Sequence, residues 1–73
     1  MERLLEILSS VRGDVDFKNE KKLIDGKVLD SFDIIAIVGA IDEEYGIEID
    51  VDDLEPENFN SAEAIFELIN RML

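Results

Sequence analysis

Residues 29–46 read LDSFDIIAIVGAIDEEYG and contain the signals for one complete helix. The carboxylate of Asp30 can accept hydrogen bonds from free backbone N–H groups as the N-cap, and Asp33 three positions later completes a short capping box. Ser31 is then the first helical residue, and Gly46 can end the helix in the left-handed conformation. The β-branched residues here could instead mark a strand, but the stretch exceeds the usual strand length of about 4–8 residues. It therefore predicts an α-helix with a serine in its first turn.

Apolar residues repeat at spacings of three and four along this helix and predict its buried face. Gly39 lies in the interior of this helix, where a glycine costs about 1 kcal/mol relative to alanine. Two explanations stay open: another helix of the same bundle approaches closely at Gly39, or a partner protein does. In the second case the partner would meet a flat apolar surface around Ile34, Ala36, Gly39 and Ala40. The residues expected to point inward are Phe32, Ile35, Val38, Ile41 and Tyr45.

The first helix is predicted over residues 2–12, where apolar residues gather on one side and Gly13 provides a stop. Residues 14–29 show no sustained period and predict a long ordered loop, which is unusual in a small domain. The expected apolar face of the helix is Leu4, Leu5, Leu8 and Val11, with Ile7 beside it. The expected loop anchors are Val15, Phe17, Leu23, Ile24, Val28 and Leu29.

The last third of the chain predicts a short helix or turn over residues 51–59, broken in the middle by Pro56, and then a third main helix. Asn60 or Ser61 caps this helix, and Glu63 can complete a capping box with Asn60. No strand signal and no internal repeat appear. We therefore predict an all-α fold, a small four-helix bundle of three main helices and one short helix. The inward face of the last helix is expected to comprise Ala62, Ile65, Phe66, Ile69 and Met72 or Leu73.

Nineteen Asp and Glu residues against seven Lys and Arg leave a formal charge of −12 on 73 residues. A chain of this length can build one hydrophobic core, so we expect a single domain over residues 1–73. The charge repels nucleic acid and favours basic protein surfaces as partners and a monomeric state. The longest apolar run, Ile34 to Ile41, falls far short of the roughly 20 residues that membrane insertion of a helix needs. We expect a cytoplasmic protein, because the chain lacks cysteine and begins without a signal peptide.

Ser31 has no partner that would make it a catalytic nucleophile, because the chain contains no histidine and no cysteine. We therefore expect no enzyme activity and no catalytic residues. Residues 50–53 begin like a calcium-binding EF-hand loop. The pattern then breaks, because Leu54 stands at the fifth position, Glu55 replaces the required glycine, and Ser61 replaces the bidentate glutamate. We expect no specific metal site, and a serine better suited to being modified than to attacking a substrate.

The motif Asp30-Ser31-Phe32 resembles that of the acyl carrier protein family, in a variant similar to D-alanyl and related aminoacyl carrier proteins. The resemblance continues through residues 42–49 (DEEYGIEI) and 60–65 (NSAEAI) and covers nearly the whole chain. It implies that Ser31 carries a phosphopantetheine arm through a phosphodiester, added by a phosphopantetheinyl transferase that uses coenzyme A and magnesium. The terminal thiol would hold an acyl or aminoacyl group as a thioester, supplied by a loading ligase or synthase.

The cargo and one competing function follow from weaker signals. Phe32 and the weakly charged face of its helix favour an aminoacyl or specialised acyl cargo over bulk fatty acid biosynthesis. The alternative to a carrier is an acidic protein-interaction module without a prosthetic group. It is motivated by the nine acidic residues between Asp42 and Glu57.

Overall fold

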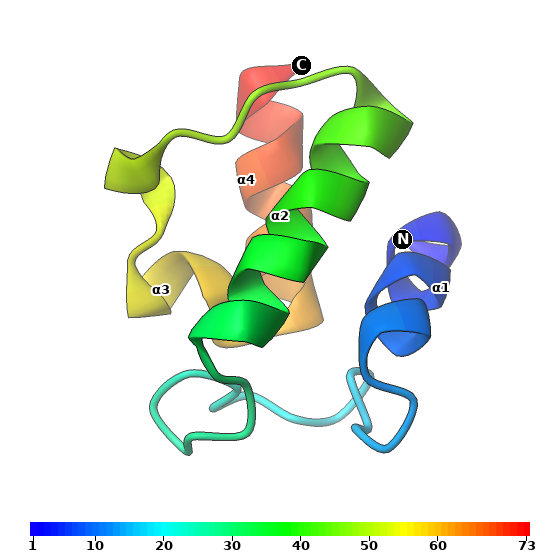
Figure 1. Cartoon of the computed structure of the whole chain (residues 1–73), viewed down its shortest axis with the longest axis vertical. Coiled ribbons are helices and arrows are strands. Elements are labelled where there is room, and N and C mark those ends of the chain that lie inside the picture. The colour runs from blue at the N-terminus through cyan, green and yellow to red at the C-terminus, as the bar shows by residue number, and fades with distance from the viewer.

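The computed structural model describes residues 1–73, and all its regular elements are helices (Figure 1). Helix α2 crosses the front of the molecule, with α1 beside it and α4 behind it, while the short α3 lies near the start of α2. The predicted four-helix bundle is confirmed, with one additional turn of 3₁₀ helix. The elements are α1 (Glu2–Val11), α2 (Ser31–Tyr45), η1 (Val51–Asp53), α3 (Pro56–Phe59) and α4 (Ala62–Met72).

The hydrophobic core draws on every α-helix and on the loop between α1 and α2. It contains 14 buried residues, and no polar or charged side chain is buried with them. The predicted inward residues of α1 and α4 are largely confirmed, because spacings of three and four place them on one helical face. The buried residues are Leu4, Ile7, Leu8, Phe17, Leu23, Leu29, Ile37, Ile41, Ile49, Phe59, Ala62, Ile65, Leu68 and Ile69.

The predicted inward face of α2 is wrong in its first two turns. Phe32 is 83% exposed and Ile35 is 66% exposed, whereas Ile37 and Ile41 are buried. Residues 34–41 are apolar on every side, so two different helical stripes satisfy the same spacing rule. Packing against α1 decides between them and turns the Ile37 side inward.

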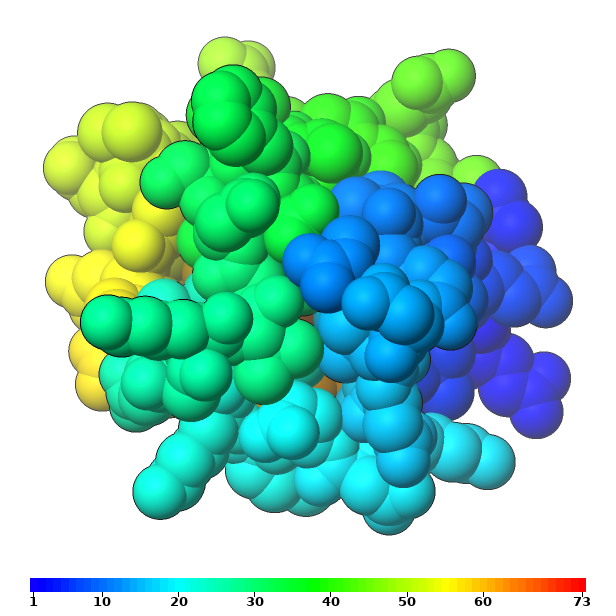
Figure 2. Space-filling model, turned by 60° about the horizontal axis from the view of Figure 1, so that its bottom comes forward, coloured from blue at the N-terminus to red at the C-terminus, as the bar shows by residue number.

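Residues 12–30 form the predicted ordered loop, which covers one end of the bundle (Figure 2). Its predicted apolar anchors are confirmed, since three of the six are buried and the other three pack against the core. Asn60 holds the middle of this loop. Its side-chain oxygen accepts from the amides of Ile24 at 3.1 Å and Asp25 at 3.0 Å, and its backbone oxygen accepts from Leu23 at 2.9 Å.

The prediction that Asn60 and Glu63 form a capping box is wrong, because the loop amides occupy Asn60. Ser61 is the N-cap of α4, and its hydroxyl accepts from the Ala64 amide at 3.1 Å. Glu63 pairs with Lys21 instead. Pro56 begins α3 and does not break a helix in its middle. The N–H groups at the start of a helix have no acceptor within it, so the N–H that proline lacks costs no hydrogen bond there.

None of the helices combines the length and the apolar character that crossing a membrane requires.

Replacing Asn60 with alanine should lower the free energy of unfolding by about 1–3 kcal/mol, because two loop amides lose their acceptor. Urea denaturation would measure the loss, and hydrogen exchange at Ile24 and Asp25 should accelerate. Asn70→Ala, at an exposed position of α4, is the matched control and should change stability by less than about 0.5 kcal/mol. Equal losses in the two variants would contradict this function of Asn60.

Candidate functional site

The start of α2 is defined by two reciprocal hydrogen bonds. The Asp33 amide donates to the Asp30 carboxylate at 2.9 Å, and the Asp30 amide donates to the Asp33 carboxylate at 3.2 Å. Asp30 is the N-cap in extended backbone, so the predicted capping box is confirmed. Ser31 is the first helical residue and is exposed. Gly46 ends the helix at φ 66°, as predicted.

Arg12 connects the end of α1 to this capping box. Its Nη1 lies 2.6 Å from the Asp33 carboxylate, and its Nε lies 2.9 Å from Asp14. The Asp30 amide and the Arg12 guanidinium hold the pKa of Asp33 below its usual range, although partial burial acts in the opposite direction. Sequence reasoning missed Arg12, because no local pattern relates two charges 21 positions apart.

The first turn of α2 leaves backbone donors free beside the serine. The Asp33 amide is taken by Asp30, but the amides of Ser31 and Phe32 have no acceptor within the chain. Free amides at a helix N-terminus lie at the positive end of the macrodipole and favour a negative group. The Ser31 hydroxyl therefore lies in solvent where a phosphate ester would be stabilised.

The turn before α2 places unusual constraints on two neighbouring residues, a positive φ at Lys27 and a close backbone approach at Gly26. Lys27 has a φ of 59°, which is the left-handed region that glycine usually occupies. Gly26 has no positive φ, but a Cβ there would lie 2.6 Å from the Lys22 carbonyl oxygen. After this turn the amides of Val28 and Leu29 both donate to the Leu23 carbonyl. The turn delivers the chain to Asp30 in extended conformation.

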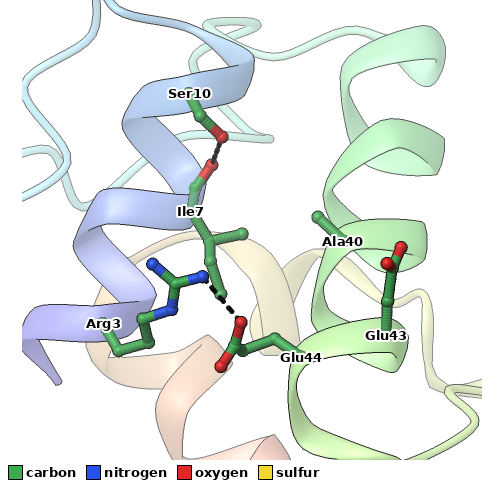
Figure 3. Close-up of a pocket in the computed structure, with 6 residues that line it drawn as sticks. All are labelled: Arg3, Ile7, Ser10, Ala40, Glu43 and Glu44. Carbon is green, nitrogen blue, oxygen red and sulfur yellow. Dashed lines mark hydrogen bonds and ion pairs between the residues drawn. The ribbon is translucent and has the colours of Figure 1, made fainter.

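A hollow of about 470 Å³ lies between α1 and α2, away from the first turn of α2 (Figure 3). Arg3 reaches across it to Glu44 at 2.6 Å, and the Ser10 hydroxyl donates to the Ile7 carbonyl. No base stands beside Ser10, since the chain has no histidine. The hollow is lined by charged side chains but contains no nucleophile paired with a base, as a catalytic site would need. It is lined by Arg3, Ile7, Ser10, Ala40, Glu43 and Glu44.

A second hollow, of about 480 Å³, is acidic and lies beside the start of α3. Asp25, Glu55 and Glu57 line it together with Pro56 and Asn60. A side-chain hydrogen bond with Glu57 and the charge of that neighbour raise the pKa of Glu55. The side chains of the chain form no group of three or more that could hold a metal ion.

Comparison with known proteins gives two matches. The model of a protein family described as a phosphopantetheine attachment site matches residues 2–69. The acyl carrier protein of Buchnera aphidicola subsp. Baizongia pistaciae is 34% identical in an alignment of length 71 that covers 94% of this chain and 88% of that protein. No solved structure matches the chain.

Lys27→Gly should stabilise the fold by up to about 1 kcal/mol, because glycine adopts positive φ without the steric cost of a side chain. Gly26→Ala should destabilise it, since the new methyl group collides with the Lys22 carbonyl. Thermal and urea unfolding would compare both with Lys18→Gly, an exposed lysine without positive φ, which should lose about 0.4–1 kcal/mol. Stabilisation by Lys18→Gly as well would contradict the backbone explanation.

Acidification should remove the stabilisation that Asp33 provides. Its pKa is lower in the folded state, so the stabilisation is complete above the ordinary Asp value of about 3.9 and is lost as pH falls through the folded value. The difference in free energy of unfolding between the wild type and Asp33→Asn should therefore shrink between about pH 6 and pH 2. Urea unfolding at several pH values measures it, and a constant difference would contradict the ionic basis.

Proposed function

Because this chain belongs to the acyl carrier protein family, whose members hold phosphopantetheine covalently, we propose that Ser31 is the residue that carries the group. The chain is a carrier protein and not an enzyme. Carriers of this kind interact with a phosphopantetheinyl transferase and with acyl-processing enzymes. The chemistry of the cargo resides in the attached group, which supplies a thiol that this cysteine-free chain lacks.

The observation that carries the assignment is the free, exposed hydroxyl of Ser31 at the start of a 15-residue helix. The other three serines differ in setting. Ser10 donates its hydroxyl to a backbone carbonyl, and Ser61 uses its own to cap α4. Ser9 lies in the last turn of α1, at the negative end of that helix's macrodipole. Ser31 alone combines an uncommitted hydroxyl with free amides in the same turn.

The surroundings of Ser31 fit a phosphodiester. The two free amides of the first turn and the helix macrodipole favour its negative charge by about 0.3–1 kcal/mol at an exposed site. The carboxylates of Asp30 and Asp33 oppose it, but Asp33 already faces the guanidinium of Arg12. The favourable amides and the opposing carboxylates leave only a small net stabilisation of the phosphate. A small stabilisation is sufficient, because the group is held by a covalent bond.

The attachment reaction needs a base from outside this chain. The Ser31 oxygen forms a bond to the pantetheine-bearing phosphorus of coenzyme A, the pyrophosphate bond breaks, and adenosine bisphosphate leaves. The hydroxyl proton must go to a base, and no histidine is present to take it. The transferase therefore supplies the base and the metal, and this chain supplies a positioned hydroxyl.

The cargo we propose is an acyl or aminoacyl group held as a thioester. Ala36 and Gly39 stand on the face of this helix where carriers with fatty acid partners tend to have acidic residues, and acids appear on it only at Asp42 and Glu43. This supports an aminoacyl or specialised acyl cargo, loaded by a dedicated ligase or synthase, over bulk fatty acid synthesis.

Incubation of the apo protein with coenzyme A, magnesium and a phosphopantetheinyl transferase should add the mass of the arm, and Ser31→Ala should abolish the gain. Intact-protein mass spectrometry measures both. Ser9→Ala, another exposed serine, is the matched control and should be modified like the wild type. No gain in the wild type, with a transferase shown to modify another carrier, would overturn the assignment.

A further inference from the structure

Helix α2 is bridged to the bundle on the side that faces α1. On its outer side, a Cβ at Gly39 would meet no atom within 4 Å, so no other helix approaches there and the first explanation for this glycine is wrong. On the α1 side, Arg3 in the first turn of α1 pairs with Glu44 in the last turn of α2 (Figure 3). Arg12 at the end of α1 pairs with Asp33 in the first turn of α2. The two bridges therefore join the same helices at opposite ends.

The bridge at the serine end is the better shielded of the two. The Arg12 side chain is 31% exposed and that of Asp33 is 15% exposed. The Arg3 side chain is 57% exposed and its partner Glu44 is 38% exposed. Exposed ion pairs contribute little to stability, whereas partly shielded, charge-assisted hydrogen bonds are stronger and hold a defined geometry. Of the two bridges, the one at Arg12 is therefore the one that can fix the position of the residues it joins.

The Arg12 guanidinium holds the chain on both sides of Ser31. Its Nη1 donates to the Val28 carbonyl at 3.4 Å, three residues before the serine, and to Asp33 at 2.6 Å, two residues after it. Its Nε and Nη2 donate to the two carboxylate oxygens of Asp14 at 2.9 and 3.0 Å, and this paired contact fixes the plane of the guanidinium. One side chain of α1 thus determines where the segment that contains the serine lies.

Arg12 reaches Ser31 through the capping box. The Asp33 oxygen that accepts from Arg12, Oδ2, also accepts from the Asp30 amide at 3.2 Å. If Arg12 is removed, the Asp33 carboxylate loses its counter-charge and can turn toward water, and the Asp30 amide then loses its acceptor. Ser31 lies between the two residues of the box, so a loosened box leaves its hydroxyl less well placed.

The place of the hydroxyl matters because attachment is a displacement at phosphorus. The Ser31 oxygen bonds to the phosphorus of coenzyme A, adenosine bisphosphate leaves, and the proton goes to a base of the transferase. A misplacement of about 1 Å can cost up to about 100-fold in rate. An Asp33 carboxylate without its counter-charge would also repel the anionic phosphate. Both effects slow the bond-forming step.

Building on the assignment of Ser31, we propose that Arg12 is a positioning residue for the attachment of the arm. It forms no hydrogen bond with Ser31 and acts through Asp33. It keeps the Asp33 carboxylate in the capping box, which fixes the serine hydroxyl, and it neutralises that carboxylate beside the new phosphodiester.

The test measures transferase kinetics with coenzyme A against the concentration of the full-length apo carrier. Arg12→Met should lower kcat about tenfold and leave KM nearly unchanged, because the reacting hydroxyl is displaced while the exposed surface of α2 stays the same. Arg12→Lys should lower kcat only about threefold, since lysine keeps the charge but not the planar fork. Arg3→Met removes the bridge at the other end of α1 and is the matched control, with kcat and KM as in the wild type.

Two further measurements show whether Arg12 acts through Asp33. In an Asp33→Asn background, Arg12→Met should change kcat by less than about twofold, because two residues that act as one unit are not additive. Hydrogen exchange at the amides of Asp30 and Asp33 should accelerate in Arg12→Met and stay at the wild-type rate in Arg3→Met. If Arg12→Met fails to fold, Arg12→Lys replaces it in each comparison.

Three results would overturn the proposal while the assignment of Ser31 stands. They are a wild-type kcat in Arg12→Met, an equal fall of kcat in Arg3→Met, and a rise in KM alone, which would place Arg12 in contact with the transferase. A wild type that gains no arm, with a transferase shown to modify another carrier, defeats the assignment of Ser31 itself.

Discussion

The reciprocal hydrogen bonds between Asp30 and Asp33 are the interaction on which the site depends. They determine where α2 begins, and they use the donor of the third helical residue while leaving the donors of Ser31 and Phe32 free. A start one residue later would remove Ser31 from the first turn. Arg12 strengthens this arrangement by joining the end of α1 to Asp33, so the serine is positioned by the packing of two helices as well as by local capping.

Packing against α1 sets the rotation of α2 about its axis. With Ile37 and Ile41 packed inward, Phe32, Ile35 and Gly39 must face outward, because residues on one helical face cannot share the opposite one. Ser31 therefore lies at the start of an exposed apolar surface that is not part of the core of the free protein. A small carrier needs little more than this, since the reactive group is attached and the partners perform the reactions.

Local signals in the sequence predicted the limits of α2, because capping residues and a C-terminal glycine act within one helical turn. The inward side of α2 could not be predicted, since Ile34 to Ile41 are apolar on every side and only packing against α1 distinguishes them. Long-range partners were hidden for a similar reason. Asn60 accepts hydrogen bonds from a loop 35 residues earlier, and Arg12 pairs with a helix that begins 19 residues later. Neither interaction produces a periodic pattern in the sequence.

The most direct measurement is the mass of the protein purified from the cells that make it, followed by fragmentation to locate any added group. We expect a population that carries phosphopantetheine on the peptide containing Ser31, with the rest of the chain unmodified. An arm on another serine, or an unmodified chain at every stage of growth, would contradict the conclusion that the exposed hydroxyl at the start of α2 is the attachment point.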